Sequence, residues 1–196
     1  GSYYVIDAAH AWAITVGSAA NVAAIVYTGI IPHPDLIGRV IPGYDFISDP
    51  DDARDGDARD DNPKDWGTYG SADECGGDAT DSSWHGSHVA GTFGAVGDNG
   101  YGIVGVDWRT RIQSVRVLGR CGAGTTTDIV EGMLWAAGGA IPGVPPNPTP
   151  ARVINLSIGG KHECSAFEQS AYDEALSRGA LVVVSAGNSN DNADLY

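Results

Sequence analysis

One short segment of the sequence combines residues that can transfer protons with residues that allow a close approach. It reads His85-Gly86-Ser87-His88-Val89-Ala90-Gly91-Thr92. A helix that starts in this way directs its first histidine out of the N-terminal turn, where it can act as a general base. The two glycines and the small residues let another backbone pass close by. The segment therefore predicts His85 as the base for a nucleophile supplied elsewhere in the fold, although a helix-start histidine can also simply cap or fill space.

The same histidines allow a second interpretation, a zinc site. His85 and His88 are three residues apart and would face one side of a helix. No third ligand follows at a spacing that is usual for zinc, and Cys75 is better explained by a disulfide. A nucleotide site is also disfavoured, because Gly119 to Gly124 lacks the G-x-G-x-x-G order.

Three further blocks accompany the histidine segment in a fixed order. They are Asn21 to Ile30 with the end Tyr-Thr-Gly-Ile, Ile154-Asn155-Leu156-Ser157-Ile158-Gly159-Gly160, and Val182-Val183-Val184-Ser185-Ala186-Gly187-Asn188. Together the four blocks resemble the subtilisin-like serine peptidases (subtilases), whose histidine block usually has Thr where this chain has Ser87. The closest resemblance is to a secreted bacterial branch with acidic, calcium-binding loops. The resemblance implies an extracellular serine endopeptidase that uses an Asp-His-Ser triad, with His85 as base and Asn188 as oxyanion-hole donor.

The chain departs from that family at two places. Tyr27 occupies the position where the family has its catalytic aspartate, and a neutral phenol offers no negative charge at neutral pH. Losing that charge in an analogous triad costs on the order of 10⁴ in turnover, and the bulkier ring is expected to displace His85. The 196 residues also contain no G-T-S-M-A serine block. We therefore expect residues 1–196 to form an incomplete, C-terminally truncated peptidase domain that is inactive as it stands.

The resemblance also indicates how a substrate would bind. An extended polypeptide can pair with a strand-like segment on each of its two sides, and glycines there permit close approach. The predicted substrate-binding residues are Leu118, Gly122, Ala123, Gly124, Ile129, Ser157, Ile158 and Gly159. Ordinary loop glycines and core aliphatic residues remain the alternative.

Acidic residues crowd between Asp45 and Asp65, inside a long polar loop of a kind that is usually functional or braced by a metal. Alternating carboxylates around a glycine suit calcium, although the closing Glu of an EF-hand is absent. The predicted calcium ligands are Asp49, Asp52, Asp55, Asp57, the Arg59 carbonyl and Asp60. A weaker second calcium site, similar to the family's high-affinity one, is predicted from Asp35 with Val96, Asn99 and Ile103. A disordered acidic loop is the alternative to the first site.

The cysteine count is odd, with Cys75, Cys121 and Cys164. The resemblance implies a disulfide between Cys75 and Cys121 and a partner for Cys164 outside these residues. Three free thiols are the alternative.

The order of elements predicts an α/β fold. The expected strands are Val22–Tyr27, Arg39–Phe46, Ile112–Val117, Arg152–Leu156 and Leu181–Ser185, and the expected helices are Ile6–Trp12, His85–Val96, Thr126–Gly138 and Ala166–Ser177. Apolar runs that alternate with helical patterns indicate a parallel α/β sheet, and the resemblance implies helices on both faces in the three-layer arrangement of subtilisin. An unfinished sheet edge at Leu181–Ser185 would expose apolar surface, so we expect self-association or marginal stability.

The bulk composition limits the possible partners. A formal net charge of −14 argues against nucleic acid, which requires clustered Lys and Arg. The apolar runs are too short to span a membrane. A secreted protein that acts on polypeptides fits best. The competing hypotheses are a non-catalytic peptide-binding pseudo-protease and a self-assembling fragment.

Overall fold

The centre of the molecule is a parallel sheet of five strands. The computed structural model describes residues 6–160, 163–188, 190 and 192. The strands are β1 (Val22–Tyr27), β2 (Val40–Asp45), β3 (Arg111–Arg116), β4 (Val153–Leu156) and β5 (Leu181–Val184), in the spatial order β2-β3-β1-β4-β5. Each predicted strand is present, with ends that differ by at most one residue.

Four longer helices and two short ones surround the sheet. They are α1 (Ala8–Ile14), α2 (Pro50–Ala53), α3 (Ala72–Cys75), α4 (His85–Gly94), α5 (Thr126–Ala136) and α6 (Ala166–Ser177), with 3-10 turns η1 (Pro34–Leu36) and η2 (Arg120–Gly122). Capping side chains fix two of the starts: Thr125 accepts a hydrogen bond from the Asp128 amide, and Ser165 forms a reciprocal capping box with Glu168. The short helices α2 and α3 lie in the polar loop and were not predicted.

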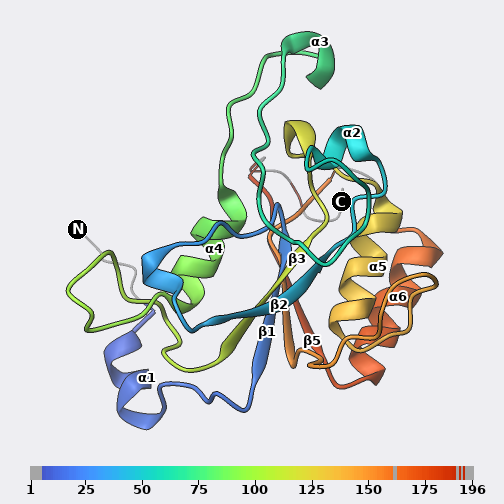
Figure 1. The fold of residues 1–196 in the computed structure, drawn as a ribbon. Coiled ribbons are helices and arrows are strands. Elements are labelled where there is room, and N and C mark those ends of the chain that lie inside the picture. The colour runs from blue at the N-terminus through green and yellow to red at the C-terminus, as the bar shows by residue number, and fades with distance from the viewer. Residues whose placement is uncertain (1–5, 161–162, 189, 191, 193–196) are drawn as a thin grey trace.

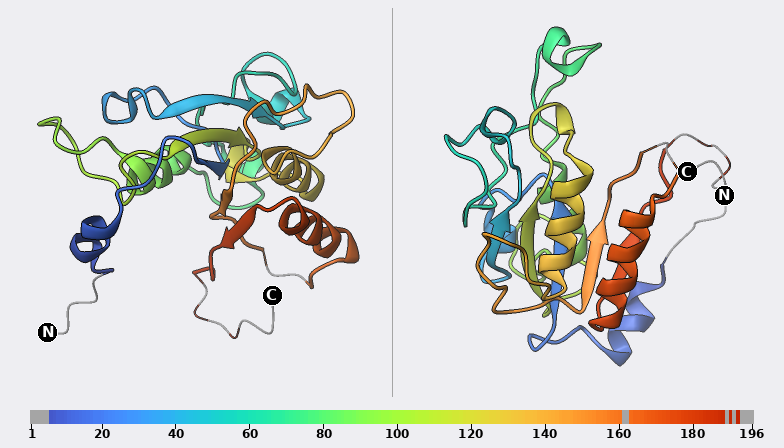
Figure 2. Two further views of the ribbon diagram at one scale, coloured as in Figure 1. Left: turned by 90° about the horizontal axis from the view of Figure 1, so that it is seen from below. Right: turned by 90° about the vertical axis from the view of Figure 1, so that its right-hand side faces the viewer.

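The two faces of the sheet are covered unequally. Helices α5 and α6 lie on one side and enclose the larger core, whereas α4 lies on the other side over β1 and η1 (Figure 2, left). Val182 packs into the larger core, so its neighbours Leu181 and Val183 point to the α4 side. They are 57% and 45% exposed, and Val153 on β4 is 37% exposed. The architecture confirms the predicted α/β fold, but the α4 side is open over β4 and β5.

A long excursion, residues 66–84 with α3 at its tip, projects beyond the carboxyl ends of the strands (Figure 1). We call it the α3 finger. The predicted disulfide between Cys75 and Cys121 is present and joins the finger to η2. Gly70 and Thr80 exchange backbone hydrogen bonds across it at 2.9 Å. Cys164 is an exposed free thiol.

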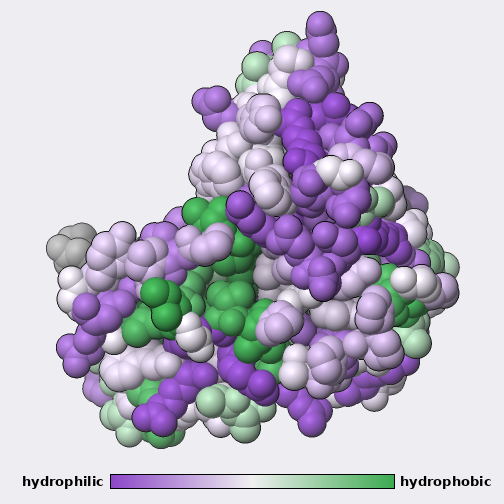
Figure 3. All heavy atoms as spheres, in the orientation of Figure 1, coloured by the Kyte–Doolittle hydropathy of each residue, from purple (hydrophilic) through white to green (hydrophobic). Residues whose placement is uncertain are grey.

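The surface reflects the uneven composition. Strongly hydrophilic residues gather around α2 and on one side of the α3 finger, whereas an apolar patch lies below the finger (Figure 3). Ile37 and Val40, on either side of the start of β2, are among the exposed large apolar residues. Among the described helices, none has the length and apolar character needed to cross a bilayer.

Candidate functional site

The carboxyl end of β1 meets the start of α4, and glycines make this contact possible. Gly86 packs against the carbonyl of Gly29, where an added side chain would collide. The Gly86 amide donates to Thr28 Oγ1 at 3.1 Å. The expected close approach of another backbone is thus confirmed at Gly86, whereas Gly91 faces open space and has no such role.

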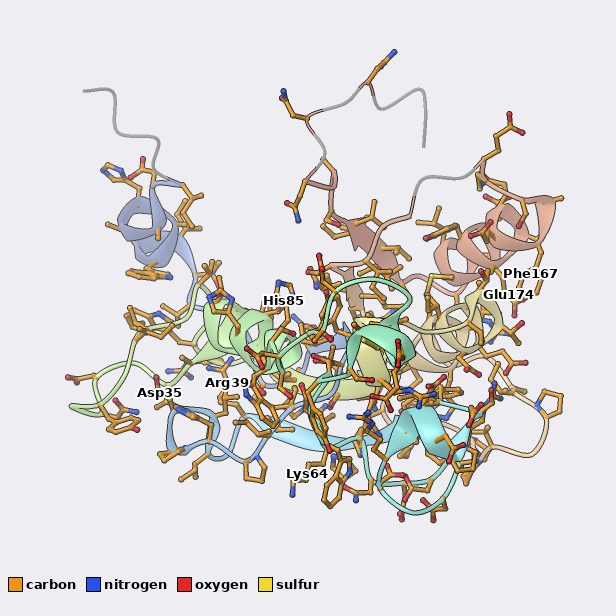
Figure 4. All side chains as sticks on the ribbon, turned by 90° about the horizontal axis from the view of Figure 1, so that it is seen from above. Asp35, Arg39, Lys64, His85, Phe167 and Glu174 are labelled. Carbon is orange, nitrogen blue, oxygen red and sulfur yellow. A yellow bond between two sulfur atoms is a disulfide. The ribbon has the colours of Figure 1, made fainter. Side chains whose placement is uncertain are left out.

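Trp84 fixes where the helix begins. It adopts a left-handed conformation, with φ of +50°, directly before His85, the first residue of α4. Such a conformation is uncommon for a bulky residue and turns the chain sharply into the helix. His85 therefore leaves the first turn next to the end of β1, as predicted from the sequence (Figure 4).

Tyr27 contacts His85 through its ring. The two ring centroids are 4.6 Å apart with an interplanar angle of 45°. The Nδ1 atom of His85 is buried, and among the described residues it has no hydrogen-bond partner. Burial lowers the pKa of His85, and His88, whose ring centroid is 6.2 Å away, lowers it further. Burial also raises the pKa of Tyr27, so the phenol stays neutral beside the imidazole.

Asn188 follows β5 at the same end of the parallel sheet. It comes directly after Gly187, which has a positive φ of 75°, and it is exposed. An exposed amide at this edge can donate to a bound group, which is compatible with the predicted role.

The predicted substrate-binding residues divide into two groups. Leu118 is buried in the larger core, and Ile129 and Ile158 pack against that core, which favours the alternative interpretation for Leu118. The exposed residues are Gly122, Ala123, Gly124 and Gly159, with Ser157 half-buried. These two segments follow β3 and β4, the strands on either side of β1, so they flank the end of β1.

Three carboxylates converge beside β2. Asp45, Asp55 and Asp60 each present an oxygen within 4.8 Å of the others. Arg116 Nη1 donates to Asp45 Oδ2 at 2.5 Å and to Asp55 Oδ2 at 2.9 Å, and one cation for three carboxylates leaves a local deficit of positive charge. Asp55 Oδ1 is buried without a hydrogen-bond partner among the described residues. Burial raises the pKa of Asp45 to about 7 despite Arg116, and burial with nearby carboxylates raises that of Asp60.

The predicted calcium ligands overlap this cluster only in part. Asp55 and Asp60 belong to it, and Asp45, which was not predicted as a ligand, is the third member. Asp49 instead caps α2 by accepting from the Asp51 amide, and Asp52 pairs with Arg120 at 2.8 Å. The Arg59 guanidinium pairs with Asp128 and Glu131, and Asp57 is exposed. Only Asp55 and Asp60 of the predicted ligands belong to the cluster, and the full ligand set, which includes the Arg59 carbonyl, stays a prediction.

The residues of the predicted second calcium site also contact one another, and these contacts are hydrogen bonds that N–H groups donate to Asp35. Asn99 Nδ2 and the Ile103 amide donate to the Asp35 carboxylate at 2.8 and 2.9 Å, and the Val96 amide donates to the Asp35 carbonyl. These donors hold the pKa of Asp35 below its usual value. These contacts hold Asp35 against the loop of residues 96–103, and the second calcium site stays a prediction.

Comparison with known proteins agrees with the geometry. The model of the Subtilase family matches residues 14–196. The chain is 49% identical over 178 residues to an extracellular basic protease of Dichelobacter nodosus, covering 88% of this chain and 29% of that protein. It is 48% identical over 184 residues to an extracellular protease of Xanthomonas campestris pv. campestris, covering 93% and 31%.

A solved structure of a protease from Pseudoalteromonas arctica superposes with a TM-score of 0.90 at 48% identity, covering 93% of this chain and 54% of that one. The chain thus spans about a third of the length of these two curated relatives and about half of this solved chain. The family model extends over nearly the whole chain, and the histidine, glycine and asparagine positions lie at one end of a parallel sheet. The chain belongs to the subtilase family.

Proposed function

We propose that the whole protein is a secreted serine endopeptidase and that residues 1–196 supply its general base and an oxyanion-hole donor but are catalytically silent. His85 would take the proton of a serine contributed from outside these residues, and Asn188 would donate to the developing oxyanion. The exposed segments 122–124 and 157–159 would hold an extended polypeptide on either side.

The proposed lack of catalytic activity rests on the environment of His85 Nδ1. A working triad needs an anionic acceptor on this atom, which selects the tautomer and stabilises the imidazolium. Here the atom is buried and has no partner in the described part of the chain, and the neutral Tyr27 ring lies against the imidazole with ring centroids 4.6 Å apart. Protonation would place a charge in a partly buried position with no carboxylate hydrogen-bonded to Nδ1 among the described residues, so His85 is a poor base in this state.

Tyr27→Asp in the full-length protein tests the proposal. We expect hydrolysis of an unfolded polypeptide to appear or to rise by on the order of 10⁴, and to be abolished by a serine-directed reagent. Tyr27→Asn is the matched control, because it relieves the same bulk without adding charge, and it should remain close to the parent. High activity of the unmodified protein, or silence of folded Tyr27→Asp, would contradict the proposal.

We also propose that Asp45, Asp55 and Asp60 bind calcium. Three hard oxygen ligands, a local excess of negative charge and the unpartnered Asp55 Oδ1 fit a divalent cation of this kind. The ion would supply positive charge that holds the acidic loop against β2. Its role would be structural, since the carboxylates hold the acidic loop through Arg116 on β3.

A peptide-binding protein without catalysis is the second candidate. It is favoured by the combination of exposed strand-like segments with a histidine that lacks a carboxylate partner. In that case Tyr27→Asp would leave hydrolysis absent while peptide binding persists in the unmodified protein.

A further inference from the structure

We infer that Asp65 is a positioning residue for His85, an inference that rests on the proposed role of His85 as base. Asp65 is 1% exposed. Its Oδ2 accepts from Thr28 Oγ1 at 2.7 Å and its Oδ1 accepts from the Gly67 amide at 2.8 Å. Thr28 Oγ1 in turn accepts from the Gly86 amide at 3.1 Å. A three-member relay thus joins a buried carboxylate to the residue that follows His85.

The carboxylate determines the direction of this relay. An ionised carboxylate can only accept, so the Thr28 hydroxyl must turn its proton towards Asp65. Its lone pairs are then free to accept from Gly86 N–H, and the charge of Asp65 polarises the hydroxyl and strengthens that second bond. Gly86 N–H is one of the donors at a helix start that have no partner within the helix. The relay therefore anchors the first turn of α4.

The backbone around the relay is built for this contact. Gly29 has no side chain, so the segment 63–65 lies directly against it, and the Ile30 amide donates to the Pro63 carbonyl at 3.3 Å. On the other side, the Ile31 amide donates to Ser87 Oγ at 3.0 Å. His85 is consequently flanked by the sharply turned Trp84 and two residues that are both tied to the end of β1.

Asp65 also places a carboxylate in the interior, at a position where close packing alone does not require a charged side chain. Among the described residues no cation pairs with it, and the neighbouring Lys64 ammonium lies over the Trp66 ring at 4.0 Å. An unpaired buried carboxylate is costly, so a neutral residue would fill the space at a lower cost. A negative charge behind the first turn favours the imidazolium that forms when His85 accepts a proton.

Nuclear magnetic resonance on the chain itself tests both effects. In Asp65→Asn, the new amide can donate to Thr28 Oγ1 and reverse the relay. We expect hydrogen exchange of the Gly86 amide to accelerate by about tenfold, the effect of one lost hydrogen bond, and the pKa of His85 to fall. Asp78→Asn removes an equal charge from an exposed position of the α3 finger and should change neither quantity.

A second pair of variants separates the hydroxyl from the charge. Thr28→Val should accelerate hydrogen exchange of the Gly86 amide by a similar factor, while Thr28→Ser should behave like the parent. If Asp65→Asn does not fold, this pair tests the relay instead. Parental Gly86 exchange in Thr28→Val, or a His85 pKa in folded Asp65→Asn equal to that in Asp78→Asn, would overturn the inference. Neither measurement involves hydrolysis, so a failure of Tyr27→Asp to restore activity would leave this result intact.

Discussion

The disulfide between Cys75 and Cys121 should be a large single contributor to the stability of the chain. It closes a loop over a sequence separation of 46 residues. The chain-entropy relation for a loop of this length gives ~4 kcal/mol at 25 °C, of which some is offset if the reduced chain stays compact. We therefore expect the combined variant Cys75→Ser and Cys121→Ser to lower the free energy of unfolding by about 3 to 4 kcal/mol.

The rest of the α3 finger offers little to replace the bond. Its ion pairs, from Arg54 and Arg120 to Glu74, involve a partly exposed carboxylate at 3.4 and 3.3 Å, and pairs of this kind contribute roughly 0 to 1 kcal/mol. The backbone pair of Gly70 and Thr80 is a single bridge. Without the disulfide, the finger should detach from η2 before the sheet unfolds.

Urea unfolding followed by tryptophan fluorescence measures the first effect, and limited proteolysis within 66–84 measures the second. Cys164→Ser is the control, since it removes a thiol and leaves the disulfide intact, and it should fall within ~0.5 kcal/mol of the parent. If the double serine variant unfolds at the same urea concentration and its finger resists proteolysis, the loop-entropy reasoning is refuted for this chain.

Three further predictions concern the site, the acidic cluster and the open sheet edge. Because the folded-state pKa of His85 lies below its unfolded value, the unfolded chain binds the extra proton first, so His85 should contribute a loss of stability as the pH falls below about 6.5. Asp45, whose pKa is raised to about 7, acts in the opposite direction over the same range, so the test is the difference between variants: between pH 7.5 and 5 the urea midpoint should fall less, or rise more, in His85→Gln than in the parent. Calcium should raise the melting temperature of the chain. Asp45→Asn should abolish this shift, whereas Asp57→Asn, at an exposed position, should retain it. Equal shifts in both variants would exclude the cluster as the calcium site. Sedimentation should detect association of the chain at micromolar concentration, reduced by Leu181→Lys or Val183→Lys, and a stable monomer in the parent would contradict this.

The strands and longer helices could be predicted because their signals are local. Apolar runs mark β1 and β5, and Thr125 and Ser165 cap their helices through contacts three residues away. The short helices α2 and α3 could not be found in this way, since four residues in a polar loop carry no periodicity.

The sequence blocks identified the site residues that lie within them. Residues that reach the site through contacts between distant segments could not be identified in this way. His85 and Tyr27 were placed by their blocks, and the structure adds the ring contact and the unpartnered Nδ1. Asp45 was missed because it ends a strand and joins the acidic cluster through tertiary contacts, namely backbone hydrogen bonds with Asp60 and the ion pair with Arg116, 71 residues away in sequence. Asp65 was missed for the same reason, because its partner Thr28 is 37 residues away.

The unequal covering of the sheet has a consequence for the order of folding. On one side, β4, α6 and β5 follow one another closely in the sequence and pack with α5, so this half can collapse through short loop closures. On the other side, α4 reaches β1 only after more than fifty residues of intervening chain, so its docking requires a longer loop closure than any within the β4–α6–β5 half. The relay from Asp65 through Thr28 to Gly86 forms in that docking step. We therefore expect the geometry around the histidine to mature after the β4–α6–β5 half has collapsed.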